Sequence, residues 1–255
     1  MTKTILAFFT DTHLGQKLIT KTEIPGDKMG YENTPRQHEQ HLRLVLSDIA
    51  RRGISKIVFG GDIGTACSVG GFFEHLRAHA FDVSLILGNH DTYGDVAPYH
   101  DMSGATVAGK LCYSQQDPHL KRIFLDTSDN VVGDGQRGWL ARELEGVRQA
   151  AIFLHHPILP LDTPIDRTGA ALRDRDEVRS LLIGMDRRIS LFCGHYHMTD
   201  EAREANITQY VSPAVSYQIV KQSERLTADT GTFGYRILEM DEEEIKTQVV
   251  LFSRT

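Results

Sequence analysis

Histidine, aspartate and asparagine residues recur in five short blocks along this chain. The blocks contain Asp11 and His13; Asp62; Asn89, His90 and Asp91; His155 and His156; and His195 and His197. Mixed imidazole and carboxylate ligands suit Mn, Fe, Zn, Co or Ni better than Mg or Ca alone. The set exceeds the four ligands of a tetrahedral zinc site, so two ions that share one carboxylate are the natural arrangement.

Two ions held close together can clamp a phosphoryl group and lower the pKa of a bound water. The blocks therefore predict two divalent metal ions as cofactors, with Mn, Fe, Zn and Co as candidates. They also predict phosphoester hydrolysis by a hydroxide that bridges the ions and attacks phosphorus in line. This chemistry requires no serine, cysteine or threonine nucleophile.

An apolar run of strand-like length precedes each block. The runs cover residues 5–9, 57–59, 83–87, 151–154 and 189–193. Continuous apolar runs of this length favour strands that are buried on both faces. Ligands bind such sheets at the carboxyl ends of the strands. If the strands are neighbours, the five blocks converge on one edge.

The stretches between the runs predict helices. Leu42, Val45, Leu46 and Ile49 recur at helical spacing before Gly53, and further helices are expected over 72–80, 136–148 and 174–182. Strand–helix alternation indicates a largely parallel sheet covered by helices. Four later runs, at 207–211, 216–220, 235–240 and 245–252, predict a second sheet packed on the first, with a solvated turn at 241–244.

The composition is that of an ordinary globular protein. The 255 residues can form one domain over 1–255, and the net charge of −6 argues against a stable nucleic-acid partner. Three cysteines without a CxxC pair favour a reducing compartment. No apolar run reaches the length of a signal-peptide core or a membrane span, so we expect a cytoplasmic protein without a membrane partner.

Taken together, the blocks resemble the calcineurin-like metallophosphoesterases. The matching segments are Asp11-Thr-His13, Gly61-Asp62, Gly88-Asn-His-Asp91, His155 before His156-Pro157, and Gly194-His-Tyr-His197, in the order of that family. The resemblance implies an α/β fold, a four-layer αββα sandwich of two mixed sheets flanked by helices.

The resemblance also implies roles for single residues. Asp11, His13 and His197 would bind the first metal, Asn89, His155 and His195 the second, and Asp62 would bridge the two. His90 would not be a ligand but would stabilise or protonate the leaving oxygen. Asp91 would orient His90 through the other ring nitrogen.

The substrate class is less sharply indicated. The Asp-Arg-Gly of Ser/Thr protein phosphatases is absent after Gly61-Asp62. Residues 136–140 and 212–218 resemble the class III cyclic nucleotide phosphodiesterases and the glycerophosphodiesterases, which implies a small phosphodiester substrate. Ile158 and Tyr196 depart from that branch and leave the substrate preference open.

Two alternatives remain beside a phosphodiesterase. A phosphomonoesterase or nucleotide pyrophosphatase could use the same metals. A non-catalytic scaffold could have the same fold, although every ligand position here is filled. A homo-oligomer is expected from the resemblance alone.

The remaining candidates have simpler explanations. The pairs His38 and His41, and His75 and His79, could each bind a metal, but surface or interface positions are the better interpretation. His119 is also expected at the surface, while His100 is a candidate to reach the substrate. His156 could contact the substrate or support the ligands. The loop at 158–173 is long enough to select the substrate. Its Arg167 or Arg173 could pair with a second phosphate, but solvated arginines are the simpler expectation.

Overall fold

Two mixed sheets form the centre of the molecule. The computed structural model describes residues 3–20, 30–33, 35–118, 120–224 and 226–253, with the backbone alone at 17–20, 30–33 and 35. The first sheet has the order β17 (Ile245–Ser253), β16 (Thr232–Met240), β1 (Thr4–Phe9), β4 (Lys56–Phe59) and β5 (Asp82–Leu85). Strands β1, β4 and β5 are parallel, whereas β16 and β17 add to β1 as an antiparallel hairpin.

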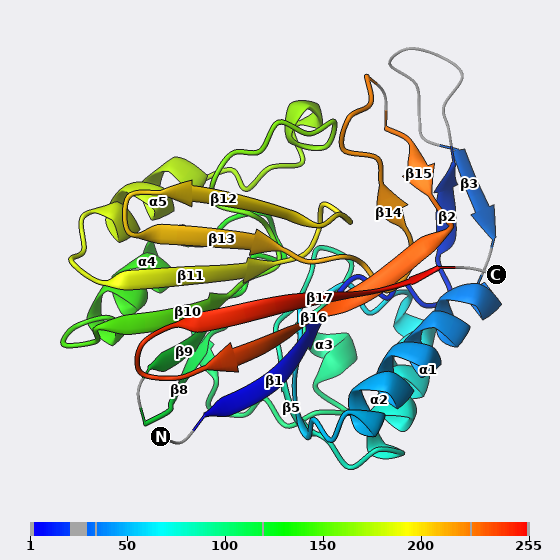
Figure 1. Cartoon of the computed structure of the whole chain (residues 1–255), viewed down its shortest axis with the longest axis horizontal. Helices are drawn as coiled ribbons and strands as arrows, with labels where there is room; N and C mark the ends of the chain where they lie inside the picture. The colour runs from blue at the N-terminus through cyan, green and yellow to red at the C-terminus, as the bar shows by residue number, and fades with distance from the viewer. Residues whose placement is uncertain (1–2, 21–29, 34, 119, 225, 254–255) are drawn as a thin grey trace.

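The second sheet repeats this plan. Its order is β12 (Asp200–Glu204), β13 (Ile207–Val211), β11 (Arg188–Cys193), β10 (Gln149–Phe153), β9 (Lys121–Phe124) and β8 (Tyr113–Gln116). The four central strands are parallel, and β12 and β8 are antiparallel edges. The arrowheads of β11 and β13 point toward the end of the sandwich where β14 (Gln218–Ile219) and β15 (Ala228–Asp229) lie (Figure 1).

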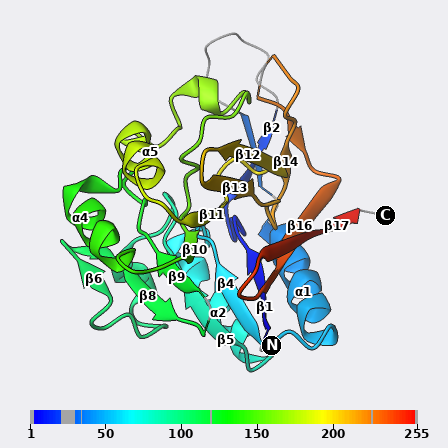
Figure 2. The same ribbon diagram turned by 60° about the vertical axis from the view of Figure 1, so that its left-hand side comes forward.

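Helices cover the outer face of each sheet. Helices α1 (Pro35–Arg51) and α2 (Val69–Arg77) pack on the first sheet, and α4 (Gly133–Glu143) and α5 (Arg175–Ile183) pack on the second. Figure 2 shows α4 and α5 on one side of the strands and α1 on the other. Shorter elements are α3 (Tyr93–Val96), the 3-10 turns η1 (Ala66–Ser68) and η2 (Asp166–Thr168), and the pairs β2 (Lys17–Thr20) with β3 (Gly30–Asn33) and β6 (Thr106–Val107) with β7 (Lys110–Leu111).

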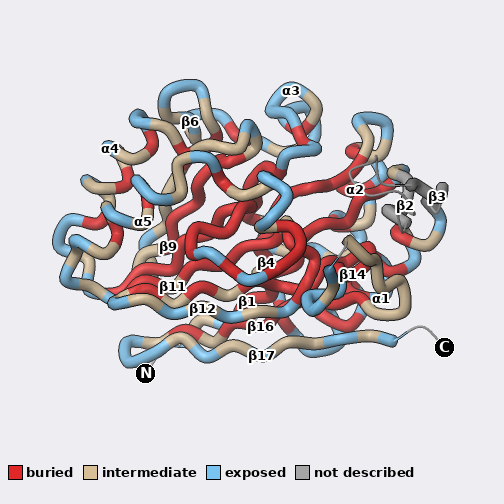
Figure 3. Tube along the Cα trace, turned by 90° about the horizontal axis from the view of Figure 1, so that it is seen from above, coloured by how far each residue is buried: buried red, intermediate tan, exposed pale blue. Residues whose placement is uncertain are grey.

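Alternation along each strand produces three apolar layers. In β1, Phe8 packs between the sheets, where its ring centroid lies 5.7 Å from that of Phe153, while Phe9 packs beneath the helices. Both faces of the central strands are therefore buried, as the continuous apolar runs predict. Figure 3 shows the result, with buried strands in the middle and exposed loops around them. The predicted four-layer αββα sandwich is confirmed.

The distribution of strands between the sheets differs from the expectation. The five runs that precede the blocks do not form one sheet: β1, β4 and β5 lie in the first and β10 and β11 in the second. The later strands are also divided, since β13 joins the second sheet and the β16–β17 hairpin joins the first. A run that is buried on both faces fits the middle of either sheet equally well, so its composition does not identify its neighbours.

The predicted helices and the turn at 241–244 are found in the structure. Leu42, Val45, Leu46 and Ile49 are fully buried on one face of α1. Helix α4 ends earlier than expected, at Glu143, because Leu144 caps it and Gly146 takes a left-handed conformation. No helix in the described part of the chain is both long and apolar enough to cross a membrane.

Candidate metal centre

The five blocks meet at the carboxyl ends of strands from both sheets. Three groups bring one ligand atom per residue within 4.8 Å of one another: Asp11, His13 and His197; Asp62, His155 and His195; and His13, Asp62 and His90. The first sheet supplies the residues after β1, β4 and β5, and the second sheet supplies those after β10 and β11. The predicted convergence is therefore present, although the edge is shared by two sheets.

The carboxylate of Asp11 lies at the centre of the first group. Its Oδ2 accepts hydrogen bonds from the backbone N–H of His195 at 3.0 Å and the hydroxyl of Thr10 at 2.7 Å. Its Oδ1 is buried without a hydrogen-bond partner among the described residues. The same oxygen lies 3.2 Å from Nε2 of His197 and 3.7 Å from Nε2 of His13. A buried carboxylate oxygen without a donor is costly, and a cation at this point would satisfy it.

Four imidazoles are oriented by carbonyl oxygens. Nδ1 of His155 donates to the carbonyl of Gly60 at 2.8 Å, and Nδ1 of His197 donates to that of Tyr217 at 3.0 Å. Nε2 of His195 donates to the carbonyl of Ala170 at 3.0 Å, and Nδ1 of His13 donates to the side-chain carbonyl of Gln16. A carbonyl only accepts, so each of these nitrogens carries a proton. The other nitrogen of each neutral ring is left with its lone pair, as metal-binding histidines require.

The remaining ring nitrogens face other nitrogen and oxygen atoms. Nε2 of His13 and Nε2 of His197 are 3.0 Å apart, and Nε2 of His155 lies 3.2 Å from Oδ1 of Asn89. Two acceptors at this distance repel unless a proton or a metal ion lies between them. The donor set thus fits a divalent transition metal.

Asp62 lies between the two groups. Its Oδ2 is 3.2 Å from Nε2 of His155 and 3.5 Å from Nε2 of His13. Its Oδ1 accepts the backbone N–H of His90 at 2.9 Å. One carboxylate oxygen therefore faces imidazoles of both groups, the position that a shared ligand needs.

The charges of the residues at this centre reinforce the fit. Burial acts to raise the pKa of Asp11, yet the neighbouring His197 and His13 rings hold it well below its usual value. Burial acts to lower the pKa of His155, but Asp62 and Asp11 outweigh it and raise that pKa to about 10. Two buried carboxylates thus draw positive charge into the centre, as a proton or as a metal ion.

Asp91 has partners other than the His90 ring that the resemblance implied. Its Oδ2 accepts the backbone N–H groups of Asp62 at 2.7 Å and Gly88 at 2.9 Å, and its Oδ1 accepts that of Ile63 at 2.9 Å. Both oxygens are therefore occupied by backbone donors. Asp91 clamps the turn that carries Asp62 against the turn that carries Asn89.

A cavity of about 210 Å³ opens onto the centre. Its polar lining comes mainly from His13, Asp62, Asn89, His90, His195 and His197. It is also lined by Tyr217, Ile219, Leu226, Ile165, Thr168 and Ala170, together with Gln16 near His13. The loop at 158–173 thus forms part of the wall, as expected, but through small and apolar residues.

The two arginines of that loop have other partners. Arg167 donates to Asp162 and to the carbonyl of Ser223, and Arg173 donates to the carbonyl of Asp129. Neither lines the cavity. The simpler expectation, arginines at the solvated surface, is the one that the structure supports.

His38 and His41 are buried within the chain, so the expectation of surface or interface positions is wrong. Nδ1 of His38 donates to the carbonyl of His13 at 2.8 Å, and Nδ1 of His41 donates to the carbonyls of Val215 and Ser216. The His41 ring also stacks on Phe233, with centroids 3.8 Å apart. Both histidines thus connect α1 by hydrogen bonds to the backbone at and near the metal centre.

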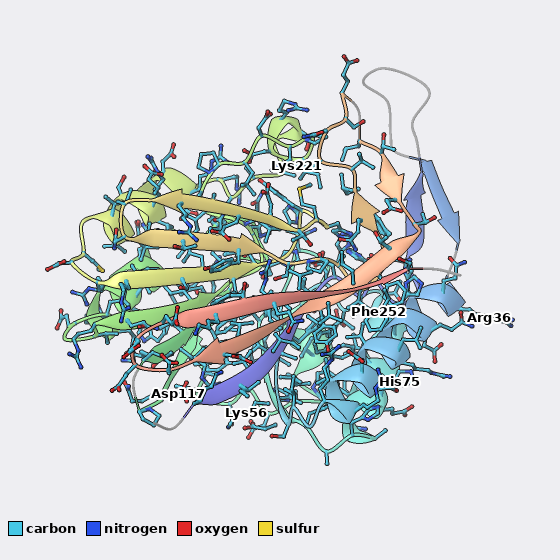
Figure 4. The ribbon with its side chains drawn as sticks, viewed as in Figure 1. Arg36, Lys56, His75, Asp117, Lys221 and Phe252 are labelled. Atoms are coloured by element: carbon cyan, nitrogen blue, oxygen red, sulfur yellow. The ribbon has the colours of Figure 1, made fainter. Side chains whose placement is uncertain are left out.

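The other histidines lie as follows. His75 bonds to Glu39 in the layer of α1 and α2 (Figure 4). His100 stacks on Phe73 and lines a different cavity, away from the metal centre. His156 is buried, bonds to the hydroxyl of Thr127 at 2.9 Å and packs against the His195 ring. The prediction for His119 lies outside the described residues.

Several supporting groups were missed because they have no sequence signature. The carbonyls of Gly60, Ala170 and Tyr217 that orient the imidazoles are backbone atoms, which any residue could supply. Gln16, three residues after His13, carried a weak signal, since an amide near a ligand can orient it.

Comparisons with known proteins identify the family and the fold. The family model described as "Calcineurin-like phosphoesterase" matches residues 5–199. A probable cyclic nucleotide phosphodiesterase of Pseudoalteromonas sp. is 25% identical over 96% of this chain and 97% of its own length. One from Fibrobacter succinogenes is 25% identical over 80% of this chain and 81% of its own. The glycerophosphodiester phosphodiesterase GpdQ of Enterobacter lignolyticus is 25% identical over 56% of this chain and 55% of its own.

A solved structure shares the fold at low identity. A dimetal phosphatase from Danio rerio aligns with a TM-score of 0.65 at 14% identity, covering 95% of this chain and 98% of that protein.

Proposed function

The chain belongs to the calcineurin-like phosphoesterase family, and from this premise we propose that it hydrolyses small phosphodiesters at a dinuclear metal centre. The observation that carries the proposal is the pair of buried carboxylates, Asp11 and Asp62, whose oxygens face imidazole nitrogens from both sheets. Phosphoester hydrolysis is the general activity of the family, whereas the diester substrate and the two ions are our inference.

The ligands divide between two ions. Asp11, His13 and His197 would hold one, Asn89, His155 and His195 would hold the other, and Asp62 would contact both. When bound, such ions neutralise the phosphoryl oxygens and supply an activated water as the nucleophile. The protein's own task is to orient the imidazoles, and the carbonyls of Gly60, Tyr217 and Ala170 do so.

His90 is proposed as the group that meets the leaving oxygen. It follows Asn89 in the chain and lines the cavity, and its backbone N–H donates to Oδ1 of Asp62 at 2.9 Å. The residue is exposed, and partial desolvation beside the centre lowers the pKa of its ring. As the ester P–O bond breaks, a ring N–H in this position would stabilise or protonate the departing alcohol oxygen.

The preference for diesters is supported by the cavity and by the relatives. A diester has a second organic group, and Tyr217, Ile219 and Leu226 offer it an apolar surface beside the polar centre. The relatives that cover most of this chain are named as probable cyclic nucleotide phosphodiesterases, and GpdQ is named for glycerophosphodiesters. We therefore propose cyclic nucleotides or glycerophosphodiesters as substrates.

The test uses protein stripped of metal and reconstituted with Mn²⁺. Hydrolysis would be compared on bis-p-nitrophenyl phosphate, p-nitrophenyl phosphate, cyclic 3′,5′-AMP, cyclic 2′,3′-AMP and glycerophosphodiesters. We expect two ions per chain and a higher kcat/KM on the nitrophenyl diester than on the monoester. Asn89→Ala should lose an ion and the activity, whereas His75→Ala, which alters a histidine on the helical layer, should keep both.

Three other results would contradict the proposal in different ways. Faster turnover of the monoester would favour a phosphomonoesterase on the same centre. One ion per chain in a fully active enzyme would exclude the dinuclear site. Two bound ions without turnover of any substrate would favour a scaffold protein.

A further inference from the structure

Tyr196 lies in the chain between the candidate ligands His195 and His197, and it has a partner outside the metal centre. The residue is fully buried, and its ring packs in the apolar layer beneath α4 and α5. Its hydroxyl donates to Oδ1 of Asp166 at 2.6 Å. This bond joins the turn after β11 to the loop at 158–173, far away in the sequence.

Asp166 is the point at which that loop is held together. Its Oδ1 also accepts Nη1 of Arg175 at 2.6 Å, and its Oδ2 accepts the backbone N–H of Leu161 at 3.0 Å. The carboxylate is largely buried, with only 9% of its side chain exposed. A buried carboxylate that accepts three donors at these distances fixes the backbone around it strongly.

The residues beside Asp166 form the cavity wall. Ile165 precedes it and Thr168 follows two residues later, and both line the cavity at the metal centre. The Thr168 hydroxyl returns to the carbonyl of Ile165 at 2.7 Å, so the two move as one unit. A shift of Asp166 would therefore displace the wall.

The same loop also contacts the metal centre directly. The carbonyl of Ala170 accepts Nε2 of His195 at 3.0 Å, and Ala170 lines the cavity as well. His195 and Tyr196 are consecutive, so the loop is bound twice to one short turn. One bond orients a ligand, and the other holds the wall through Asp166.

The loop at 158–173 is bound to the turn after β11 both through Ala170 and through Asp166. We therefore propose that Tyr196 is a positioning residue that sets the wall of the cavity relative to the metal centre. It thereby determines how tightly the enzyme holds the organic group of its substrate. The inference rests on the proposed phosphodiesterase function. It assigns the recognition of that group to a wall of Ile165, Thr168 and Ala170, which the Tyr196–Asp166 bond and the His195–Ala170 bond hold against the turn after β11.

The test compares Tyr196→Phe with Tyr235→Phe. The Tyr235 hydroxyl donates to Oδ2 of Asp48 at 2.7 Å and is also buried, but it joins β16 to α1 on the other side of the molecule. Each variant loses one hydroxyl–carboxylate bond and keeps its ring. Any general loss of stability should therefore be similar in the two.

Two substrates with the same leaving group separate an effect of the cavity wall from an effect on the reacting bond. Methyl p-nitrophenyl phosphate and bis-p-nitrophenyl phosphate release the same phenolate and differ in the other ester group. In Tyr196→Phe we expect KM for the bis-aryl ester to rise roughly fivefold or more, with KM for the methyl ester within about twofold and both kcat values nearly unchanged. Tyr235→Phe should leave the ratio of the two KM values as in the wild type.

Two measurements do not depend on turnover. Calorimetry on Mn²⁺-loaded protein should show weaker binding of dibenzyl phosphate in Tyr196→Phe, with dimethyl phosphate and the metal content unchanged. Amide hydrogen exchange at Leu161 and Thr168 should become faster in Tyr196→Phe but not in Tyr235→Phe.

The outcomes separate the two proposals. Equal changes for both esters, the same selectivity change in Tyr235→Phe, or a lost ion in Tyr196→Phe would overturn the positioning role. A wild-type protein that hydrolyses neither diester would overturn the proposed function. In that case the dibenzyl-to-dimethyl binding ratio still decides whether Tyr196 sets the wall.

Discussion

At the scale of single residues, the candidate ligands have an unusual backbone conformation. Asp11, His13, Asp62, His195 and His197 have φ values of 57°, 44°, 64°, 65° and 49°. The left-handed region costs an L-residue roughly 1–2 kcal/mol, so the combined conformational cost of five such residues is substantial. Strain that gathers at one place is typical of functional sites, where surrounding contacts impose the conformation. The strain therefore supports a ligand role independently of the residue types.

His90 is the residue whose role is most open to test. It belongs to one of the three candidate groups, with His13 and Asp62, so the geometry alone permits it as a ligand. If it serves the leaving oxygen instead, His90→Ala should keep both ions and lose roughly 10²–10⁴ in kcat. Metal content by plasma mass spectrometry, measured with kcat on the same sample, makes the distinction. Loss of an ion in this variant would place His90 among the ligands.

The types and spacing of the candidate ligands could be read from the sequence, but the residues that support them could not. His38 and His41 share the face of α1 that also buries Leu42, Val45 and Ile49, so helical periodicity could have predicted their burial. Their partners are the carbonyls of His13, Val215 and Ser216. Which carbonyls a buried histidine reaches depends on how the strand ends cross in space, and residue identity does not specify this.

At the scale of elements, the turn after β11 passes very close to the end of β1. A Cβ on Gly194 would lie 2.3 Å from Oγ1 of Thr10 and 2.4 Å from Oδ2 of Asp11. Real Cβ contacts are not this short, so the two strand ends can meet only if this residue is glycine. The glycine in the last block therefore brings the ligands of one sheet within reach of those of the other.

This close approach predicts the effect of a single methyl group. Gly194→Ala should displace Asp11, weaken metal binding about tenfold or more, and lower the free energy of unfolding by roughly 1–3 kcal/mol. Gly71→Ala is the control, because its Cβ would meet nothing within 4 Å and it lies inside α2. That variant should bind metal normally and gain up to about 1 kcal/mol. Normal metal affinity in Gly194→Ala, measured by titration, would show that the contact can relax.

Most elements could be predicted from the sequence, but not their arrangement into sheets. The apolar runs before the blocks became β1, β4, β5, β10 and β11, and the helical stretches became α1, α2, α4 and α5. Strands β8, β9 and β12 were missed: YSQQ and DEARE are polar and form edges, and KRIF in β9 begins with two charged residues. The division into two sheets depends on the crossing between β5 and β8, where the chain from Ile86 to Cys112 contains only short elements. Such a connection has no periodic pattern that would reveal its destination.

At the scale of the whole molecule, the metal centre joins the two sheets. The first sheet supplies Asp11, His13 and Asp62, and the second supplies His155, His195 and His197. Bound ions would therefore tie the two halves of the sandwich together. The buried Arg236 of β16 makes a second tie, with Nη2 donating to the carbonyl of Val211 at 2.9 Å.

Metal removal should consequently lower the stability of the whole fold. At a free concentration 100 times its dissociation constant, each ion adds about 2.7 kcal/mol to the free energy of unfolding. For a chain of this size that corresponds to a fall in Tm of roughly 5–10 °C per ion removed. Calorimetric scans with Mn²⁺ and with chelator would measure it, using Asn89→Ala as the control that should shift less. An unchanged Tm after verified metal loss would mean that the centre does not tie the sheets.

The pH dependence of the metal-free protein follows from His155. Asp62 and Asp11 raise its pKa to about 10 against the effect of burial, from about 6.5 in the unfolded chain. A raised folded-state pKa contributes stability that is complete below about 6.5 and is lost as the pH rises through about 10. Between pH 7 and pH 9 the metal-free protein should therefore lose about 2–3 kcal/mol of unfolding free energy.

The metal-loaded protein should lack this loss, because a bound ion takes the place of the proton between His155 and the two carboxylates. Urea unfolding at pH 7 and pH 9, with and without metal, compares the two states. His155→Gln removes the titrating group and should flatten the metal-free profile, whereas His75→Ala should preserve it. A metal-free profile that is already flat in the wild type would mean that His155 is neutral in the empty site. The two carboxylates would then hold their positive charge elsewhere, and His13, whose pKa the Asp11 and Asp62 carboxylates raise despite burial, would be the next histidine to substitute.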